Sequence, residues 1–280
     1  MYFRIAQSNL LLHSRLIFFA YCITDATRFC FMSPDIPIRP SKIVAIHQPN
    51  FFPWLGYFDK IRRADVFILL DDVQIQKTGS SWVNRVKLNI NNEARWITCP
   101  ILRTEGVQAI HEVKIDDRQP WREKLLKSIE QNYRKAPNFQ ALRPTIEGWI
   151  HQETDNLADF NITVIQEVMQ LLGLTTPLIR HKDLNTSLHS TPMLVEIVKA
   201  TGGTTYLCGG GADRYQEDHL FEEAGITLEY QGFKPSSYGN PQQYLPGLSV
   251  LDFLLQADTP DYAKEFETLC RQGQTLATAL

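Results

Sequence analysis

Apolar residues follow two different periodicities along this chain of 280 residues. Short apolar or β-branched runs, typical of strands buried on both faces, lie at 43–46, 66–70, 178–179, 204–208 and 226–230. Apolar positions three or four residues apart predict helices at 54–61, 121–134, 139–150, 156–172, 192–200, 215–224 and from 249 onward. Strands that alternate with helices predict an α/β fold, in which a mostly parallel, Rossmann-like sheet is flanked by helices.

Several predicted helices follow one another in the middle of the chain. Between about residues 119 and 173 no strand pattern separates them, so we expect a helical insertion within a single α/β domain of residues 42–280. Before it, the segments 84–89 and 95–101 flank Asn91-Asn92, the pattern of a β-hairpin. Gly56 lies within the first predicted helix. Because glycine is unfavourable there, it indicates close packing against a neighbouring backbone.

Residues 1–41 lack the pattern of a packed element. Their apolar run, Leu16 to Ile23, is shorter than the about 20 residues that a membrane span needs. Arg15 interrupts its extension, and no A-x-A cleavage site follows. The proline-rich stretch after Met32 is typical of a disordered start. We therefore predict that residues 1–41 are a disordered or wrongly assigned extension, with translation starting at Met32.

The composition restricts the partners and the compartment. A hydrophobic fraction of 44% and a charged fraction of 21% are ordinary for a globular protein. A net charge of −3 provides no basic field for nucleic acid. The five cysteines are odd in number and lack C-x-x-C spacing, which argues against a disulfide framework or a structural zinc site. These features predict a cytoplasmic protein without a transmembrane segment.

Polar side chains follow the first two predicted strands. His47-Gln48 ends one strand and Asp71-Asp72 ends the next. In parallel α/β sheets, ligands bind at the carboxyl edge of the strands. His47 is therefore a candidate base or phosphate ligand, with a hydrogen bond to backbone as the alternative. Asp71 and Asp72 are candidates for a base or for magnesium ligands.

The alternative role for this acidic pair is a turn cap with an ion pair to Arg85 or Lys87. The loop that follows carries several donors for an anion: Lys77, Asn84 and Arg85. A guanidinium binds phosphate or carboxylate through two parallel hydrogen bonds. Trp82 in the same loop predicts either packing or stacking against a ligand. A solvated loop is the alternative for the whole segment.

A run of three glycines forms a second candidate site. Gly209, Gly210 and Gly211 follow a predicted strand and precede a helix. Glycines in that place let backbone N–H groups approach a phosphate at a helix N-terminus. The run matches neither the P-loop nor the G-x-G-x-x-G pattern. A tight turn is the alternative.

Two long blocks of sequence carry a family resemblance. The first comprises H-Q-P-N-F-F-P-W-L-G-Y-F from His47, the segment ending L-L-D-D-V-Q, and the W-x-N-R tetrad from Trp82. The second comprises Y-L-C-G-G-G-A-D-R-Y from Tyr206, then F-E-E-A-G-I, then Y-L-P-G-L-S-V-L-D-F-L-L. From about Lys42 to Asp258 the chain resembles the WbqC-like family. Its bacterial members are associated with surface-polysaccharide (O-antigen) gene clusters.

The resemblance implies an enzyme of surface-polysaccharide precursor biosynthesis. Our first hypothesis is a group transferase that acts on a nucleotide- or lipid-linked sugar. Its catalytic residues would be His47, Asp71 and Asp72, with Gln48 and Asn50 of the first block binding substrate beside the donor loop and the glycines. The second hypothesis is a noncatalytic sugar- or nucleotide-binding scaffold that contacts other polysaccharide-biosynthesis proteins. An enzyme requires the candidate residues in one cleft, whereas a scaffold requires an exposed apolar patch. The sequence specifies neither a cofactor nor a metal.

Overall fold

A five-stranded parallel sheet forms the centre of the fold in the computed structural model, which describes residues 41–76, 81–210, 216–234 and 236–278. The strand order is β7-β2-β1-β8-β9, and every neighbouring pair is parallel. The strands are β1 (Ile43–His47), β2 (Val66–Leu69), β7 (Leu178–Arg180), β8 (Thr205–Cys208) and β9 (Thr227–Tyr230). The predicted parallel α/β fold is confirmed. Residues 1–40 of the predicted N-terminal extension, Lys77 and Gly211 lie outside the described residues.

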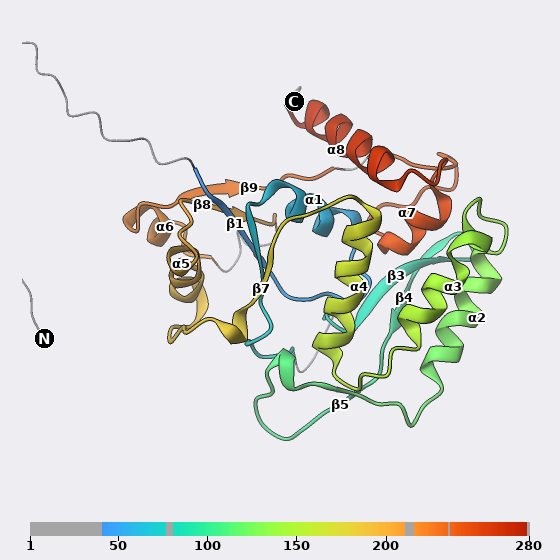
Figure 1. The fold of residues 1–280 in the computed structure, drawn as a ribbon, viewed down its shortest axis with the longest axis horizontal. Helices are drawn as coiled ribbons and strands as arrows, with labels where there is room; N and C mark the ends of the chain where they lie inside the picture. Colours follow the sequence, from blue (N-terminus) through green and yellow to red (C-terminus); the bar gives the residue numbers. More distant parts are fainter. Residues whose placement is uncertain (1–40, 77–80, 211–215, 235, 279–280) are drawn as a thin grey trace, which may run out of the picture. The chain divides into compact units, whose positions relative to one another are not determined.

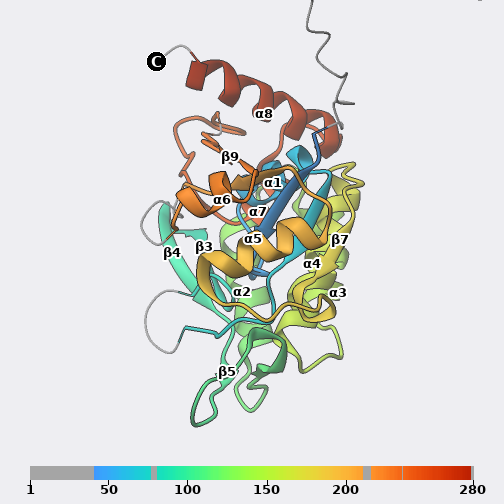
Figure 2. The ribbon, with the colours of Figure 1, turned by 90° about the vertical axis from the view of Figure 1, so that its left-hand side faces the viewer.

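Helices cover both faces of the sheet. Along β1, Val44 and Ile46 face one side and Ala45 faces the other. The first side packs against α5 (Ser190–Ala200) and α6 (His219–Glu223), and the second against α1 (Leu55–Arg63) and α4 (Leu157–Leu171). Figure 1 shows these helices on opposite sides of the strands, and Figure 2 shows α5 crossing in front of them. Burial on both faces explains why the strands read as continuous apolar runs.

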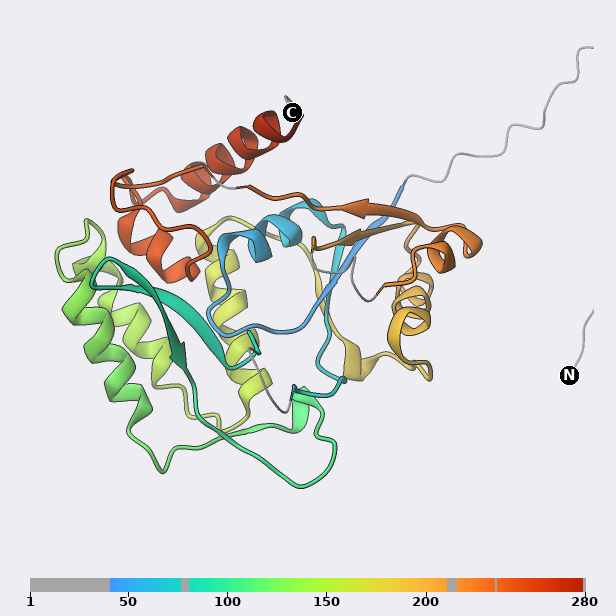
Figure 3. The same cartoon turned by 180° about the vertical axis from the view of Figure 1, so that it is seen from behind.

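A separate antiparallel hairpin lies beside the helices. Strands β3 (Arg85–Ile90) and β4 (Glu93–Thr98) pair in register on either side of Asn91-Asn92. Both asparagines have positive φ, 55° and 63°, as a two-residue hairpin turn requires. The predicted hairpin is therefore confirmed, and β3 contacts both α2 and α7 (Figure 3).

The predicted helical stretch contains three helices, α2 (Trp121–Tyr133), α3 (Phe139–Ile150) and α4. It is preceded by a short strand pair and a turn of 3-10 helix: β5 (Ile101–Leu102), η1 (Ile110–Glu112) and β6 (Lys114–Ile115). A second such turn, η2 (His181–Asp183), follows β7. The chain ends in α7 (Val250–Gln256) and α8 (Tyr262–Thr278). Among the described residues, no helix has both the length and the apolar character to cross a membrane.

Gly56 is tightly packed, although its neighbour differs from the one expected. A Cβ on Gly56 would lie 2.3 Å from the Cζ2 atom of the Trp54 side chain. The close neighbour is therefore an indole ring and not a backbone segment. Trp54 in turn packs edge-on against Phe233, with ring centroids 5.6 Å apart. Glycine at this position leaves room for the indole against the first turn of α1.

Candidate functional site

The pairing between β1 and β8 ends one residue before the carboxyl end of β8. Only three residues of each strand pair with each other, Ile43–Ala45 of β1 with Thr205–Leu207 of β8. Beyond that point, Ile46 and His47 pair with β2, whereas Cys208 pairs with Tyr230 of β9. The chain builds the sheet outward from β1 in one direction through β2 and β7, and in the other through β8 and β9. Such a switch point, where the two halves diverge, is the usual ligand site of an open α/β sheet.

A buried lysine lies at this switch point. Lys60 of α1 is only 2% exposed, and its Nζ donates a hydrogen bond of 2.8 Å to the carbonyl oxygen of Ile46. That carbonyl lies where β1 no longer pairs with β8, so the lysine satisfies an acceptor that the ladder leaves free. Burial lowers the pKa of Lys60 to about 8. The amine is thus mostly protonated at neutral pH but close to its titration range.

His47 lies beside Lys60 at the end of β1. Burial first, and then the positive charge of Lys60, lower the pKa of His47 to about 3. The ring is therefore neutral at physiological pH. Its Nδ1 lies 3.1 Å from the carbonyl oxygen of Gln48, and it packs edge-on against Tyr57 at a centroid distance of 5.0 Å. If Nδ1 donates to that carbonyl, Nε2 is an acceptor. Gln48 is partly exposed and immediately follows the strand.

The end of β8 forms the other side of this switch point. Cys208 is fully buried, and burial raises the pKa of its thiol to about 11, partly offset by the charge of Lys60. Gly209 is partly exposed and Gly210 is exposed. A Cβ on either glycine would meet no atom within 4 Å. Packing among the described residues therefore does not require glycine here, and the backbone is accessible to a ligand.

The acidic pair after β2 divides into a buried and an exposed carboxylate. Asp71 is completely buried, and its two oxygens accept hydrogen bonds from Arg180 Nε at 2.6 Å and from the Lys182 backbone N–H at 3.0 Å. The cation beside it is therefore Arg180 of β7, and not Arg85 or Lys87. Arg180 also pairs with Asp159 of α4 at 2.6 Å. Asp71 ties the end of β2 to the end of β7, which leaves it poorly available as a base or a metal ligand.

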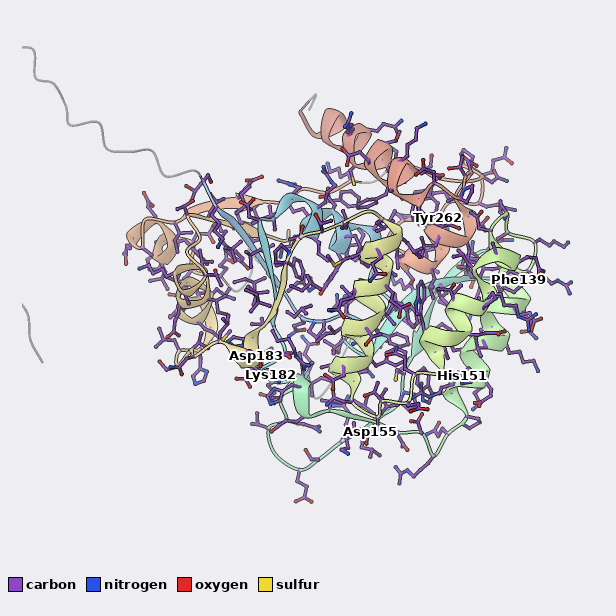
Figure 4. All side chains as sticks on the ribbon, viewed as in Figure 1. Phe139, His151, Asp155, Lys182, Asp183 and Tyr262 are labelled. Atoms are coloured by element: carbon purple, nitrogen blue, oxygen red, sulfur yellow. The ribbon has the colours of Figure 1, made fainter. Side chains whose placement is uncertain are left out.

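Asp72 faces solvent next to two histidines. Its carboxylate is 50% exposed and lies 3.4 Å from Nδ1 of His111. His181 is buried, and burial lowers its pKa, against the opposing effect of Asp72 and Asp71. Its Nε2 contacts Thr186 Oγ1 at 2.8 Å, whereas its Nδ1 is buried without a hydrogen-bond partner among the described residues. Figure 4 marks this edge of the sheet with the labels of Lys182 and Asp183.

The loop between β1 and α1 is held rigidly by distant residues. Asn161 of α4 donates hydrogen bonds to the carbonyls of Pro49 and Val83, at 2.9 and 2.7 Å. Phe52 is buried at a positive φ of 42°, an unusual conformation for an aromatic residue, and its carbonyl accepts from Ser249 Oγ at 2.8 Å. Asn50 is 3% exposed, and its Oδ1 has no partner among the described residues. This loop stores strain that the surrounding contacts maintain.

The residues of the predicted donor loop have distinct environments. Asn84 is buried, and its side-chain amide donates to the carbonyl of Cys99, while its own carbonyl accepts from the Cys99 backbone N–H and so extends the hairpin ladder. Trp82 packs against Trp96 with ring centroids 4.8 Å apart. The Arg85 guanidinium stacks over Trp96 at 3.9 Å. Its Nε is buried without a partner, and no carboxylate pairs with it among the described residues. Arg85 is therefore an oriented but unpaired cation.

The structure thus places the predicted residues in three groups. His47, Gln48, Gly209 and Gly210 lie at the switch point, Asp71 and Asp72 at the neighbouring strand end, and Trp82, Asn84 and Arg85 at the base of the hairpin. No contact between Arg85 and the acidic pair occurs among the described residues. Within the same residues, no three His, Cys, Asp or Glu side chains are arranged to hold a metal.

The sequence pattern did not reveal Lys60, Arg180 or His111. Lys60 follows Tyr57 by three residues, the spacing that places two side chains on one helix face. This was the available signal, because Tyr57 packs against the strand-end histidine. Arg180 is the last residue of β7, as His47 is the last residue of β1, and strand-end position alone identifies it as a candidate. His111 lies in a segment without a periodic pattern.

The fold and this edge define a parallel α/β protein with a buried lysine and a strand-end histidine at its switch point. The chain belongs to the WbqC-like protein family, which matches residues 48–263. It is 30% identical over 240 residues to a Mycobacterium tuberculosis (strain ATCC 25618 / H37Rv) protein named Uncharacterized protein Rv1507c, covering 82% of this chain and 100% of that protein. No solved structure matches the chain.

Proposed function

We propose that the protein is a group transferase of bacterial surface-polysaccharide precursor biosynthesis, acting in the cytoplasm on a nucleotide- or lipid-linked sugar. The biosynthetic context rests on the family resemblance carried by the two sequence blocks. The three described cysteines, Cys99, Cys208 and Cys270, are unpaired and buried, in keeping with a reducing compartment. The proposed ligand is the phosphate or diphosphate that joins the sugar to its carrier.

The observation that carries the proposal is the buried Lys60 amine at the switch point, where a pKa of about 8 keeps it mostly protonated at neutral pH. A buried ammonium without a carboxylate partner is costly, because burial removes its hydration. Its one hydrogen bond among the described residues goes to the Ile46 carbonyl, which leaves two of its three N–H groups without such a partner. A phosphate at the switch point would supply the missing acceptors and the opposite charge. The accessible backbone of Gly209 and Gly210 would form the other side of this anion site.

The remaining residues take roles that follow from their environments. With a pKa of about 3, His47 is a poor general base at neutral pH, so we assign it to hydrogen bonding with the substrate. Asp72 with His111 is the exposed polar pair available to a reacting group. Asp71 positions Arg180. Arg85, stacked and unpaired, is the second anion-binding group.

A noncatalytic binding protein is the second candidate. The occupied Asp71 carboxylate and the weakly basic His47 favour it, because both were expected to act as catalysts. Such a protein would hold the same phosphorylated sugar for other polysaccharide-biosynthesis proteins. Binding is common to both candidates, and only turnover separates them.

The test compares Lys60→Met with Lys124→Met, which removes the same charge from an exposed position on α2. Titration calorimetry against UDP-, dTDP- and GDP-linked sugars and against a polyprenyl diphosphate sugar should show binding to wild type and Lys124→Met. Lys60→Met should bind the same ligand at least about tenfold more weakly, because a charge-assisted hydrogen bond is lost. Equal binding by all three proteins would refute the anion site. Conversion of the bound ligand in the presence of cell extract would separate the transferase from the binding protein.

A further inference from the structure

A polar pocket lies away from the carboxyl edge of the sheet. It has a volume of about 300 Å³ and is formed by the hairpin turn, the end of α2 and the end of α7. The hairpin turn and these two helix ends lie close together in both Figure 1 and Figure 3. Asparagine and glutamine provide most of the lining, including Asn89, Gln131, Asn132, Gln243 and Gln256. This volume is at the lower end of the range for small-molecule sites.

The wall of the pocket is held by a buried hydrogen-bond network. Tyr133 donates to Asp252 Oδ1 at 2.8 Å and accepts from the backbone N–H of Asn89 at 2.9 Å. Tyr238 donates to the other oxygen of Asp252 at 2.7 Å. Asn132 Oδ1 accepts from the Asn91 backbone at 3.0 Å, which ties the hairpin turn to α2. The network fixes the backbone on two sides of the pocket before any ligand binds.

Other amides of the lining remain available. No hydrogen bond within the described part of the chain occupies the side-chain amides of Asn89, Gln131, Gln243 or Gln256. Each amide offers two donors and an acceptor with two lone pairs. Of the lining residues, only the exposed Lys135 is charged. The pocket therefore offers many neutral donors and acceptors and little charge.

We infer that this pocket binds a neutral saccharide, as a single ring or a short oligosaccharide. A sugar hydroxyl donates and accepts at the same time, and an array of free amides satisfies both requirements. A phosphate or a carboxylate would find one exposed lysine, and an apolar group would find mainly polar walls. The buried Tyr133 ring adds a rigid aromatic element between the amides. This inference does not depend on the anion site at Lys60.

Solution NMR of the full chain tests the inference with glucose, galactose, mannose, rhamnose and N-acetylglucosamine as probes. We expect at least one of them to shift the side-chain amide signals of Gln243 and Gln256. Gln243→Leu and Gln256→Leu should each weaken binding of that sugar about fivefold or more, since each removes at least one hydrogen bond. Gln242→Leu is the control, because Gln242 is equally exposed and adjacent but lies outside the lining. Gln243 is exposed, so its replacement should leave the fold intact.

Two results would overturn the inference. One is the absence of amide shifts with every neutral sugar of the panel. The other is binding that Gln243→Leu and Gln242→Leu leave equally strong, which would place the sugar elsewhere. Glucose 1-phosphate serves as a further comparison, and tighter binding of it than of glucose in this pocket would contradict the neutral preference. The effect of Lys60→Met on nucleotide-sugar binding tests only the proposed anion site at Lys60.

Discussion

The side chain of Lys60 donates a hydrogen bond of 2.8 Å to the main-chain carbonyl of Ile46, at the residue where β1 stops pairing with β8. The separation of two strands leaves a buried acceptor without its ladder partner, and a buried amine occupies it. The same switch point is where we propose that a phosphorylated ligand binds. Strand topology and candidate chemistry are therefore linked through one contact.

Lys60 should make stability depend on pH in a specific window. Its pKa falls from 10.5 to about 8 on folding. Between these values the unfolded chain holds a proton that the folded chain has released, so stability rises with pH. Between about pH 8 and pH 10.5, the unfolding free energy of the wild type should increase by on the order of a few kcal/mol relative to that of Lys60→Met. Urea unfolding of both proteins across this range measures the difference. If the unfolding free energies of the two proteins changed in parallel with pH, the pKa of Lys60 would not be lowered.

Asp71 and Asp72 should differ sharply when each is changed to asparagine. Asp71→Asn weakens a buried pair with Arg180, so we expect a loss of about 2–4 kcal/mol in unfolding free energy. Asp72→Asn changes an exposed carboxylate and should alter stability by less than about 0.5 kcal/mol. Chemical denaturation of the two variants provides the comparison. Similar losses for both would show that burial does not separate their roles.

Two helix glycines offer a matched test of packing. Gly56→Ala would place a methyl group against the Trp54 ring, and we expect it to cost about 1–3 kcal/mol. Gly148 of α3 has no atom within 4 Å of a Cβ, so Gly148→Ala should instead stabilise by about 0.5–1 kcal/mol. Thermal melts distinguish the signs of the two effects. A stabilised Gly56→Ala would show that the indole moves aside at little cost.

The Arg85→Lys variant tests how much the planar guanidinium of Arg85 contributes to ligand binding. Arg85→Lys keeps the charge but removes the planar guanidinium, with its paired donors and its stacking on Trp96. Phosphorylated-sugar binding should therefore weaken about tenfold. Stability should fall by only about 0.5–1 kcal/mol. Arg95→Lys, at an exposed position paired with Glu93, is the control and should bind normally. A variant that loses stability but binds like wild type would restrict Arg85 to a structural role.

Local patterns predicted much of the fold but only part of the site. The continuous apolar runs of β1 and β2, and Asn91-Asn92 between alternating segments, depend on nearby residues and were readable from the sequence. The pairing of Asp71 with Arg180 joins residues 109 positions apart, and no local pattern encodes it. The role of Lys60 depends on where β1 and β8 separate, which is a property of the assembled sheet. The Trp54 ring against Gly56 likewise follows from side-chain packing.

The pH dependence of phosphorylated-sugar binding shows whether protonated Lys60 holds the phosphate. If protonated Lys60 holds the phosphate, the dissociation constant should be constant below about pH 8 and then rise by up to tenfold per pH unit, because binding then requires proton uptake. Calorimetry on wild type and Lys60→Met from about pH 6.5 to pH 9.5 covers this range. We expect the dissociation constant of the wild type to rise with pH, and that of Lys60→Met to be high and independent of pH. Tight binding by Lys60→Met with the wild-type pH profile would contradict this role of Lys60.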